Sequence, residues 1–187
     1  MQHPSPAKRF PTLFAVLLVA VAAGIGLLVV LRHSRGSSST AGWQVVDHVA
    51  DGDTIVVRGG ETVRLVQIDT PEVYFQAECF GEQASAETKR LLPKGSLVKL
   101  IRDPATDATD VYGRLLRYVV RPDGLDVNLR LVADGAAAPY FFEGVRGEYA
   151  DVLDRDAGTA RAARKGLWGA CPGTQLAPDA GVSTGPP

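Results

Sequence analysis

Three charged side chains lie close together in residues 64–72, which read Arg-Leu-Val-Gln-Ile-Asp-Thr-Pro-Glu. Asp69 is a hard anion, Glu72 adds a second acid three residues later, and Arg64 carries a guanidinium upstream. A planar guanidinium matches the geometry of phosphate oxygens. The stretch therefore suggests chemistry on a phosphate group. An ordinary charged loop after a surface strand would have the same composition, so these residues alone leave both interpretations open.

The elements around this stretch determine where its charges point. Residues 63–68 alternate as a strand does, and Pro71 ends regular pairing because it has no N–H to donate. We therefore expect Asp69 and Glu72 at a strand exit, where side chains can point into a cleft. Simple alternation places Arg64 and Asp69 on opposite faces, so the chain must twist or bulge between them.

The rest of the pattern predicts an α+β fold, a five-stranded OB-fold β-barrel with about three helices. The predicted strands are 44–50, 54–58, 61–69, 96–102 and 114–121. The predicted helices are 82–92, 127–133 and 147–165. The polar segment 103–112 reads as a loop. A helix after the third strand and a helical C-terminal part are what place the chain in this class, by analogy at the level of fold.

Apolar residues dominate the N-terminal part of the 187-residue chain. Residues 13–31 are uncharged and long enough to span a bilayer as a helix, after a short N-terminal segment, 1–12, that carries Lys8 and Arg9. We expect an uncleaved signal anchor in the cell membrane, with the folded domain outside the cytoplasm. A cleaved signal peptide and a secreted protein are the alternative.

The remaining chain divides into three parts. Residues 32–42 have the composition of a flexible linker, 43–171 form the predicted domain, and 172–187 are rich in Pro and Gly and are expected to be disordered. Residues 41–187 carry 16 basic and 21 acidic residues, a net charge of −5. Because charge alone would not hold a polyanion, a bound cation or a local basic cluster must supply the attraction.

Two further segments repeat the residue types of 64–72: Asp51-Gly-Asp-Thr54 and Asp110-Val-Tyr-Gly-Arg114. In this order along the chain, the three segments resemble the staphylococcal nuclease (thermonuclease) family. The resemblance covers about Val45 to Trp168 and includes the terminal Lys-Gly-Leu-Trp. It implies Ca²⁺-dependent hydrolysis of DNA and RNA that leaves 3′-phosphate ends.

The resemblance implies Ca²⁺ as the cofactor, bound by the carboxylates of Asp53 and Asp69 and by the backbone carbonyl of Thr70. Ca²⁺ takes about 6–8 oxygen ligands, so this set leaves positions for water and a phosphate oxygen. The cation would polarise the phosphate as a Lewis acid.

It also implies three catalytic side chains. Arg64 and Arg114 would hold the scissile phosphate and stabilise the charge of the transition state. Glu72 would be the general base that takes a proton from water. Asp110 is a candidate partner that orients Arg114.

Aromatic residues are candidates for substrate binding. The resemblance suggests that Tyr112, Tyr140 or Phe141 contacts the nucleotide, while covering the edge of the barrel is the equally open alternative. Val111 stands where a basic residue would help to hold a terminal phosphate, which argues against tight binding of small nucleotides.

Cys79 and Cys171 are the only two cysteines. Outside the cytoplasm we expect a disulfide between them, which would close a loop of about 90 residues. Two unrelated free thiols are the alternative.

Three functions compete: a membrane-anchored extracytoplasmic nuclease, a non-catalytic OB-type module that binds nucleic acid, and a membrane-tethered structural domain. The presence of all six site residues and the negative net charge favour the nuclease. Its expected partners are nucleic acid as substrate and the membrane, and we expect a monomer.

Overall fold

The computed structural model describes residues 42–74, 76–177 and 181–187. The predicted membrane span at 13–31 lies outside the described residues, as do the segment before it and nearly all of the linker. No helix in the described part of the chain is both long and apolar enough to cross a membrane.

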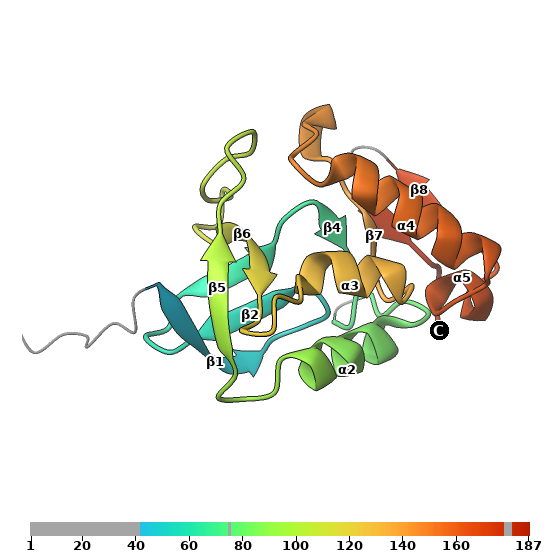
Figure 1. Cartoon of the computed structure of the whole chain (residues 1–187). Coiled ribbons are helices and arrows are strands. Elements are labelled where there is room, and N and C mark those ends of the chain that lie inside the picture. Colours follow the sequence, from blue (N-terminus) through green and yellow to red (C-terminus); the bar gives the residue numbers. More distant parts are fainter. Residues whose placement is uncertain (1–41, 75, 178–180) are drawn as a thin grey trace, which may run out of the picture. The chain divides into compact units, whose positions relative to one another are not determined.

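Five strands form a closed barrel, in the order β1-β2-β3-β6-β5 (Figure 1). Their bounds are β1 Trp43–Val49, β2 Thr54–Val57, β3 Thr62–Leu65, β5 Leu97–Ile101 and β6 Leu115–Val120. All neighbouring pairs are antiparallel except β3 and β6, which are parallel, and β1 closes the barrel against β5. This confirms the predicted five-stranded barrel of the OB type.

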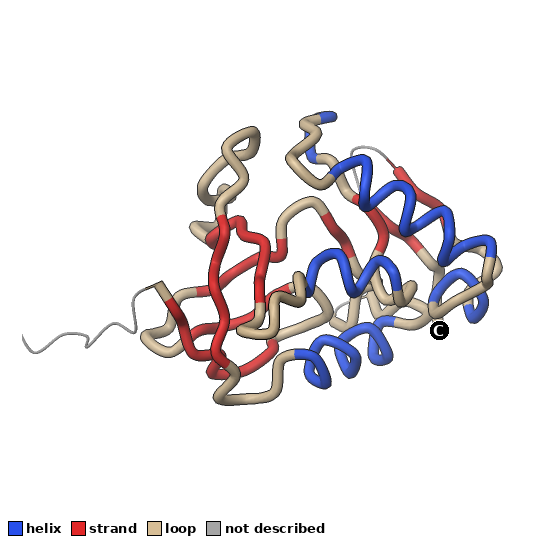
Figure 2. The backbone as a smooth tube through the Cα atoms, in the orientation of Figure 1, coloured by secondary structure: helices blue, strands red, loops and turns tan. Residues whose placement is uncertain are grey.

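The helices lie together beside the barrel (Figure 2). They are α2 Gly81–Leu91, α3 Val127–Ala133, α4 Ala150–Ala162, the short α5 Leu167–Ala170 and a 3-10 turn at Phe142–Gly144. Helix α3 packs against both α2 and α4. The three predicted helices are present, and the last is shorter than the expected 147–165.

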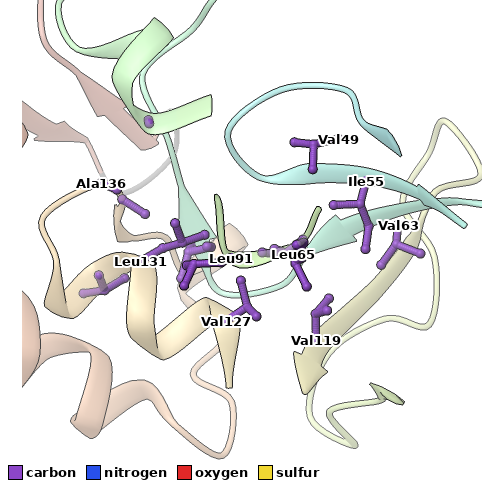
Figure 3. Close-up of a cluster of buried hydrophobic side chains, with 14 of the residues drawn as sticks. Val49, Ile55, Val63, Leu65, Leu91, Val119, Val127, Leu131 and Ala136 are labelled. Carbon is purple, nitrogen blue, oxygen red and sulfur yellow. The ribbon is translucent and has the colours of Figure 1, made fainter. Parts of the chain in front are cut away.

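One apolar core joins the barrel to these helices (Figure 3). Val63 and Leu65 on β3 belong to this cluster, and so do Leu91 on α2 and Leu131 on α3. All four side chains are buried. Because the helices bury their apolar faces in this shared core, they hold in place the loops that connect them to the barrel strands.

The prediction of a single strand over 61–69 is wrong. Strand β3 ends at Leu65, and a separate two-residue strand, β4 (Ile68–Asp69), pairs with β7 (Ala138–Pro139). Between them Gln67 has a φ of 65° in the left-handed region, which turns the chain out of the barrel. The alternation therefore stops before Asp69, and the expected conflict between opposite faces disappears.

Buried amide groups hold this corner. The Asn128 side chain on α3 donates to the Val66 carbonyl (2.9 Å) and accepts from the Val119 N–H (3.1 Å). The side chain of Gln67 donates to the Val145 carbonyl and accepts from the Gly147 N–H. These contacts pair backbone groups at the break and in the 145–147 loop beside it.

The structure describes two parts of the expected disordered tail, residues 172–177 and 181–187. Strands β8 (Gln175–Ala177) and β9 (Gly181–Ser183) form an antiparallel pair, and β9 contacts β4 and β7. Val182 and Thr184 are buried. A Pro- and Gly-rich composition does not prevent ordering here, because the folded domain supplies contacts that the segment lacks alone. A disulfide joins Cys79 to Cys171 just before this tail.

Candidate active site

The guanidinium of Arg64 lies between two carboxylates. Its Nη2 is 3.0 Å from Asp53 Oδ2 and 2.7 Å from Asp69 Oδ1. Its Nη1 donates to the carbonyls of Leu65 and Ile68, both at 2.7 Å. The turn after β3 thus wraps around the Arg64 side chain, which brings together three residues that the sequence predicted as site residues.

Asp53 sits in the turn between β1 and β2 and is linked there to Thr70. The backbone N–H and the hydroxyl of Thr70 donate to Asp53 Oδ2 at 3.0 and 3.2 Å. A Cβ on Gly52 would lie 2.3 Å from Thr70 Oγ1, so only glycine permits this approach. Asp51 accepts from the Asp53 N–H, and Thr88 on α2 donates to the Gly52 carbonyl. The turn is therefore held from both sides.

Negative charge exceeds positive charge at this site. Burial raises the pKa of Asp53 to about 6 despite the nearby Arg64 guanidinium, and burial also raises the pKa of Asp69. Burial lowers the pKa of Arg64, but the attraction of Asp53 and Asp69 outweighs it, so its pKa lies above the ordinary value. One guanidinium thus faces several carboxylates, and a bound cation would relieve the imbalance.

The donor types fit an oxygen-ligated cation. In the region that the structure describes, no three His, Cys, Asp or Glu side chains form a cluster that could hold a metal ion. The predicted set needs only two carboxylates, from Asp53 and Asp69, and the carbonyl of Thr70. Hard oxygen donors suit Ca²⁺, which commonly completes its shell with water.

Glu72 stands in a loop that closes on itself. Its N–H donates to Glu78 Oε2 (3.0 Å), and the Glu78 N–H donates to the Glu72 carbonyl (2.9 Å). Both residues line a cavity of about 310 Å³. Partial burial raises the pKa of Glu72, and so does the repulsion of Asp53 and Asp51. Glu72 is thus accessible, and it is close enough to the Asp53 turn for the charges of Asp53 and Asp51 to raise its pKa.

Arg114 pairs with an acid of its own loop. Its Nε is 2.6 Å from Asp110 Oδ2, while Asp110 Oδ1 accepts from the backbone N–H groups of Tyr112 and Arg114. Among the described residues its ion-pair partner is Asp110, as expected, and not Asp53 or Asp69. Arg114 and Tyr112 line a second pocket of about 240 Å³.

The candidate aromatics differ in their surroundings. Tyr112 is 82% exposed, and the Arg114 guanidinium lies 5.5 Å from its ring centre. Tyr140 makes an edge contact with Phe142, with 6.4 Å between ring centres. Phe141 instead packs against the hydrophobic core. Val111 is 92% exposed. Phe142, at 59% exposure, is an aromatic that the sequence did not single out.

Sequence reasoning assigned no role to two polar residues at this site, Asp51 and Glu78. Asp51 belongs to the Asp-Gly-Asp turn, where its carboxylate accepts from the Asp53 N–H. An Asp that bonds the backbone two residues later is a recognisable turn signal. Glu78 lies in an irregular stretch with no periodicity. Only the folded loop shows its contact with Glu72.

Comparison with known proteins finds a family and several relatives. A sequence model of the family described as "Staphylococcal nuclease homologue" matches residues 62–170. The chain is similar to endonuclease YhcR of Bacillus subtilis (strain 168), with 36% identity over 138 residues, 66% of this chain and 11% of that protein. It is also similar to two proteins described as "Uncharacterized endonuclease", from Escherichia coli O157:H7 and Escherichia coli. Each is 35% identical over 126 residues, which are 66% of this chain and 74% of the relative. The chain thus matches only a small part of the Bacillus protein.

Proposed function

The chain belongs to the staphylococcal nuclease family, and from this premise we propose that it hydrolyses phosphodiester bonds of DNA and RNA with bound Ca²⁺. The observation that carries the proposal is the convergence of Asp53 and Asp69 on Arg64, with an excess of buried negative charge. A domain that only bound a polyanion would gain nothing from such a cluster. The names of the relatives agree with a nuclease.

In this proposal the cation is held by Asp53, Asp69 and the carbonyl of Thr70. When bound, Ca²⁺ supplies a Lewis acid that polarises the phosphate. The protein's part is to hold both carboxylates in place. Arg64 and the hydrogen bonds from Thr70 do this before any metal arrives.

Glu72 takes the proton from the attacking water in the proposed reaction. A base whose pKa lies above the ordinary carboxylate value accepts a proton more readily. Water oxygen bonds to phosphorus, the bond from phosphorus to the 5′ oxygen breaks, and that oxygen takes a proton from solvent water, while Glu72 returns its proton to solvent. The products are a 3′-phosphate and a 5′-hydroxyl. Arg64 and Arg114 stabilise the charge that develops on the phosphate oxygens.

The proposed setting is outside the cytoplasm, with residues 13–31 as a membrane anchor and the nuclease domain acting as a monomer. The Cys79–Cys171 bond supports this setting, because disulfides persist in oxidising compartments. Release by signal cleavage would leave the same domain secreted. Fractionation of cells that express the full chain distinguishes a membrane-bound from a secreted protein.

One assay tests the function. The full chain is incubated with DNA and with RNA in Ca²⁺ and in EDTA, and product ends are identified. We expect cleavage to 3′-phosphates only with Ca²⁺, and a loss of about 10²–10⁴ in rate for Glu72→Gln. Glu148→Gln, the same change at an exposed position that lines neither pocket, is the matched control and should cleave normally.

Two results would contradict the proposal. Equal cleavage in EDTA, or by Glu72→Gln, would exclude the mechanism. Tight binding of nucleic acid with no cleavage in Ca²⁺ would identify a non-catalytic binding module instead.

A further inference from the structure

The C-terminal residues of the chain lie against the candidate active site. We call residues 181–187 the C-terminal strap. The Val182 N–H donates to Asp69 Oδ2 at 2.9 Å, and the Ser183 hydroxyl donates to Glu78 Oε1 at 2.9 Å. The strap therefore contacts a proposed metal ligand and also the residue that closes the loop of Glu72.

Further bonds hold the strap in place. The Thr184 hydroxyl donates to the Cys79 carbonyl (2.6 Å), and the Cys79 N–H donates to the Gly185 carbonyl (2.8 Å). Val182 and Thr184 are only 6% and 4% exposed. Pro187 lines the cavity that also contains Glu72. The strap is thus a docked segment with two buried side chains, and it bonds both to Asp69 and to the loop at Glu78 and Cys79.

Gly181 brings the backbone directly onto the carboxylate of Asp69. Its φ is +81°, and a Cβ there would lie 2.2 Å from Asp69 Oδ2. Any other residue would be strained in this conformation and would collide with the carboxylate. Close contact between the strap and Asp69 therefore depends on glycine at this position.

Both oxygens of Asp69 are occupied as a result. Oδ1 pairs with Arg64, and Oδ2 accepts from Val182. An N–H group presents partial positive charge to the oxygen, and backbone atoms fill the space next to it. A cation that uses this oxygen must displace the N–H group and the glycine beside it.

We propose that the C-terminal strap is an autoinhibitory segment that competes with Ca²⁺ for Asp69 and withdraws when the metal binds. The inference rests on the proposed function, in which Asp69 is a Ca²⁺ ligand. The disulfide from Cys79 to Cys171 keeps the start of the tail beside the site. The strap therefore competes as a tethered group, at a high effective concentration.

The test uses Gly181→Ala in the full chain. The added methyl collides with Asp69 Oδ2 and displaces the strap. Gly124→Ala is the matched control, because Gly124 has a φ of +84° and open space around the position of a Cβ. By calorimetry without substrate, we expect Gly181→Ala to bind Ca²⁺ roughly tenfold more tightly than wild type. The control should stay within about twofold.

A second measurement needs no substitution. Hydrogen exchange of the Val182 amide, followed by NMR in the wild-type chain, should be slow without metal and faster at saturating Ca²⁺. Because it uses the native sequence, this experiment decides the matter even if Gly181→Ala fails to fold.

The outcomes separate the strap from the proposed function. The strap proposal is overturned if folded Gly181→Ala and wild type bind Ca²⁺ with equal affinity. It is also overturned if the Val182 amide stays protected at saturating Ca²⁺. In either case, Ca²⁺-dependent cleavage by wild type still supports the nuclease. If Ca²⁺ binds to neither protein, both proposals fail. Tighter binding by Gly181→Ala together with faster exchange in wild type supports the strap.

Discussion

At the scale of single residues, Arg64 stabilises the folded site in the absence of metal. Asp53 and Asp69 are largely buried carboxylates, and burying a charge is costly unless it is paired. Arg64 pairs with both and also donates to two carbonyls of the turn that encloses it. In the absence of metal, the positive charge of Arg64 therefore partly neutralises Asp53 and Asp69, as a bound cation would.

Removing the Arg64 charge should destabilise the metal-free protein. We predict that Arg64→Gln lowers the free energy of unfolding of the metal-free protein by about 3–5 kcal/mol, because two buried carboxylates lose their partner. Added Ca²⁺ should recover part of the loss without restoring cleavage. Urea unfolding in EDTA and in Ca²⁺ measures both effects.

Arg114→Gln is the matched control for this prediction. Its ion pair with Asp110 is more exposed, so its loss should change the free energy of unfolding by no more than about 1 kcal/mol. Equal destabilisation by the two variants would show that Arg64 has no special role in the metal-free site.

At the scale of elements, the corner between β3 and β4 delivers Asp69 to Arg64. The corner depends on Gln67 in the left-handed region and on Asn128, which reaches from α3 to the Val66 carbonyl. Asn128 is fully buried. A helix that packs on the barrel thus sets the path of the strand that carries a proposed metal ligand.

We predict that Asn128→Ala lowers the free energy of unfolding by about 2–4 kcal/mol, because it leaves buried backbone groups such as the Val66 carbonyl and the Val119 N–H without partners. Denaturant unfolding measures this, with Gln83→Ala, the loss of an exposed amide on α2, as control. If both variants unfold at the wild-type urea concentration, Asn128 does not stabilise the corner.

The start of α3 gives the fold a pH dependence of its own. Asp126 caps this helix by accepting from the Leu129 N–H, and burial raises the pKa of Asp126 to about 6, above its ordinary 3.8. Ionised Asp126 therefore disfavours the folded state. The cost is fully present above pH 6 and disappears as the pH falls toward 3.8.

Asp126→Asn keeps a capping oxygen and removes this charge. We predict that it raises the free energy of unfolding by on the order of 1–3 kcal/mol at pH 8, with a smaller gain at pH 5. Thermal unfolding at the two pH values checks the sign. A gain that is larger at pH 5 than at pH 8 would contradict the assignment.

At the scale of the whole molecule, the Cys79–Cys171 bond joins the loop that follows Glu72 to the end of the last helix. The two residues are 92 positions apart in the chain. A cross-link over so long a loop restricts the unfolded chain strongly. The same bond links the loop that follows Glu72 to the chain just before the C-terminal tail, and Thr184 of the strap donates to the Cys79 carbonyl.

We predict that replacing both cysteines with serine lowers the free energy of unfolding by about 4–5 kcal/mol in the chain-entropy description. Unfolding of wild type with and without reductant should show the same difference, while the double variant should not respond to reductant. A wild-type protein that is equally stable after complete reduction would exclude this contribution.

Local patterns in the sequence determined much of this protein. Strand alternation, turn residues and helical faces predicted the order of the barrel strands and of the helices. The family resemblance carried by the Asp-Gly-Asp turn and the segment 64–72 named the site residues that the structure brings together: Asp53, Arg64, Asp69 and Thr70. These features follow from residues near one another in the chain, where periodicity and turn chemistry act directly.

Only the tertiary structure decided how those residues meet. The break at Gln67 is held by groups about 80 positions away, from Val145 to Gly147, and no local alternation contains that information. The strap reaches Asp69 across 113 positions of sequence. Its segment has the composition of a disordered tail, and it orders because the domain offers Asp69, Glu78 and Cys79 as hydrogen-bond partners. Long-range contacts of this kind exist only after the chain has folded, so local sequence patterns could not predict them.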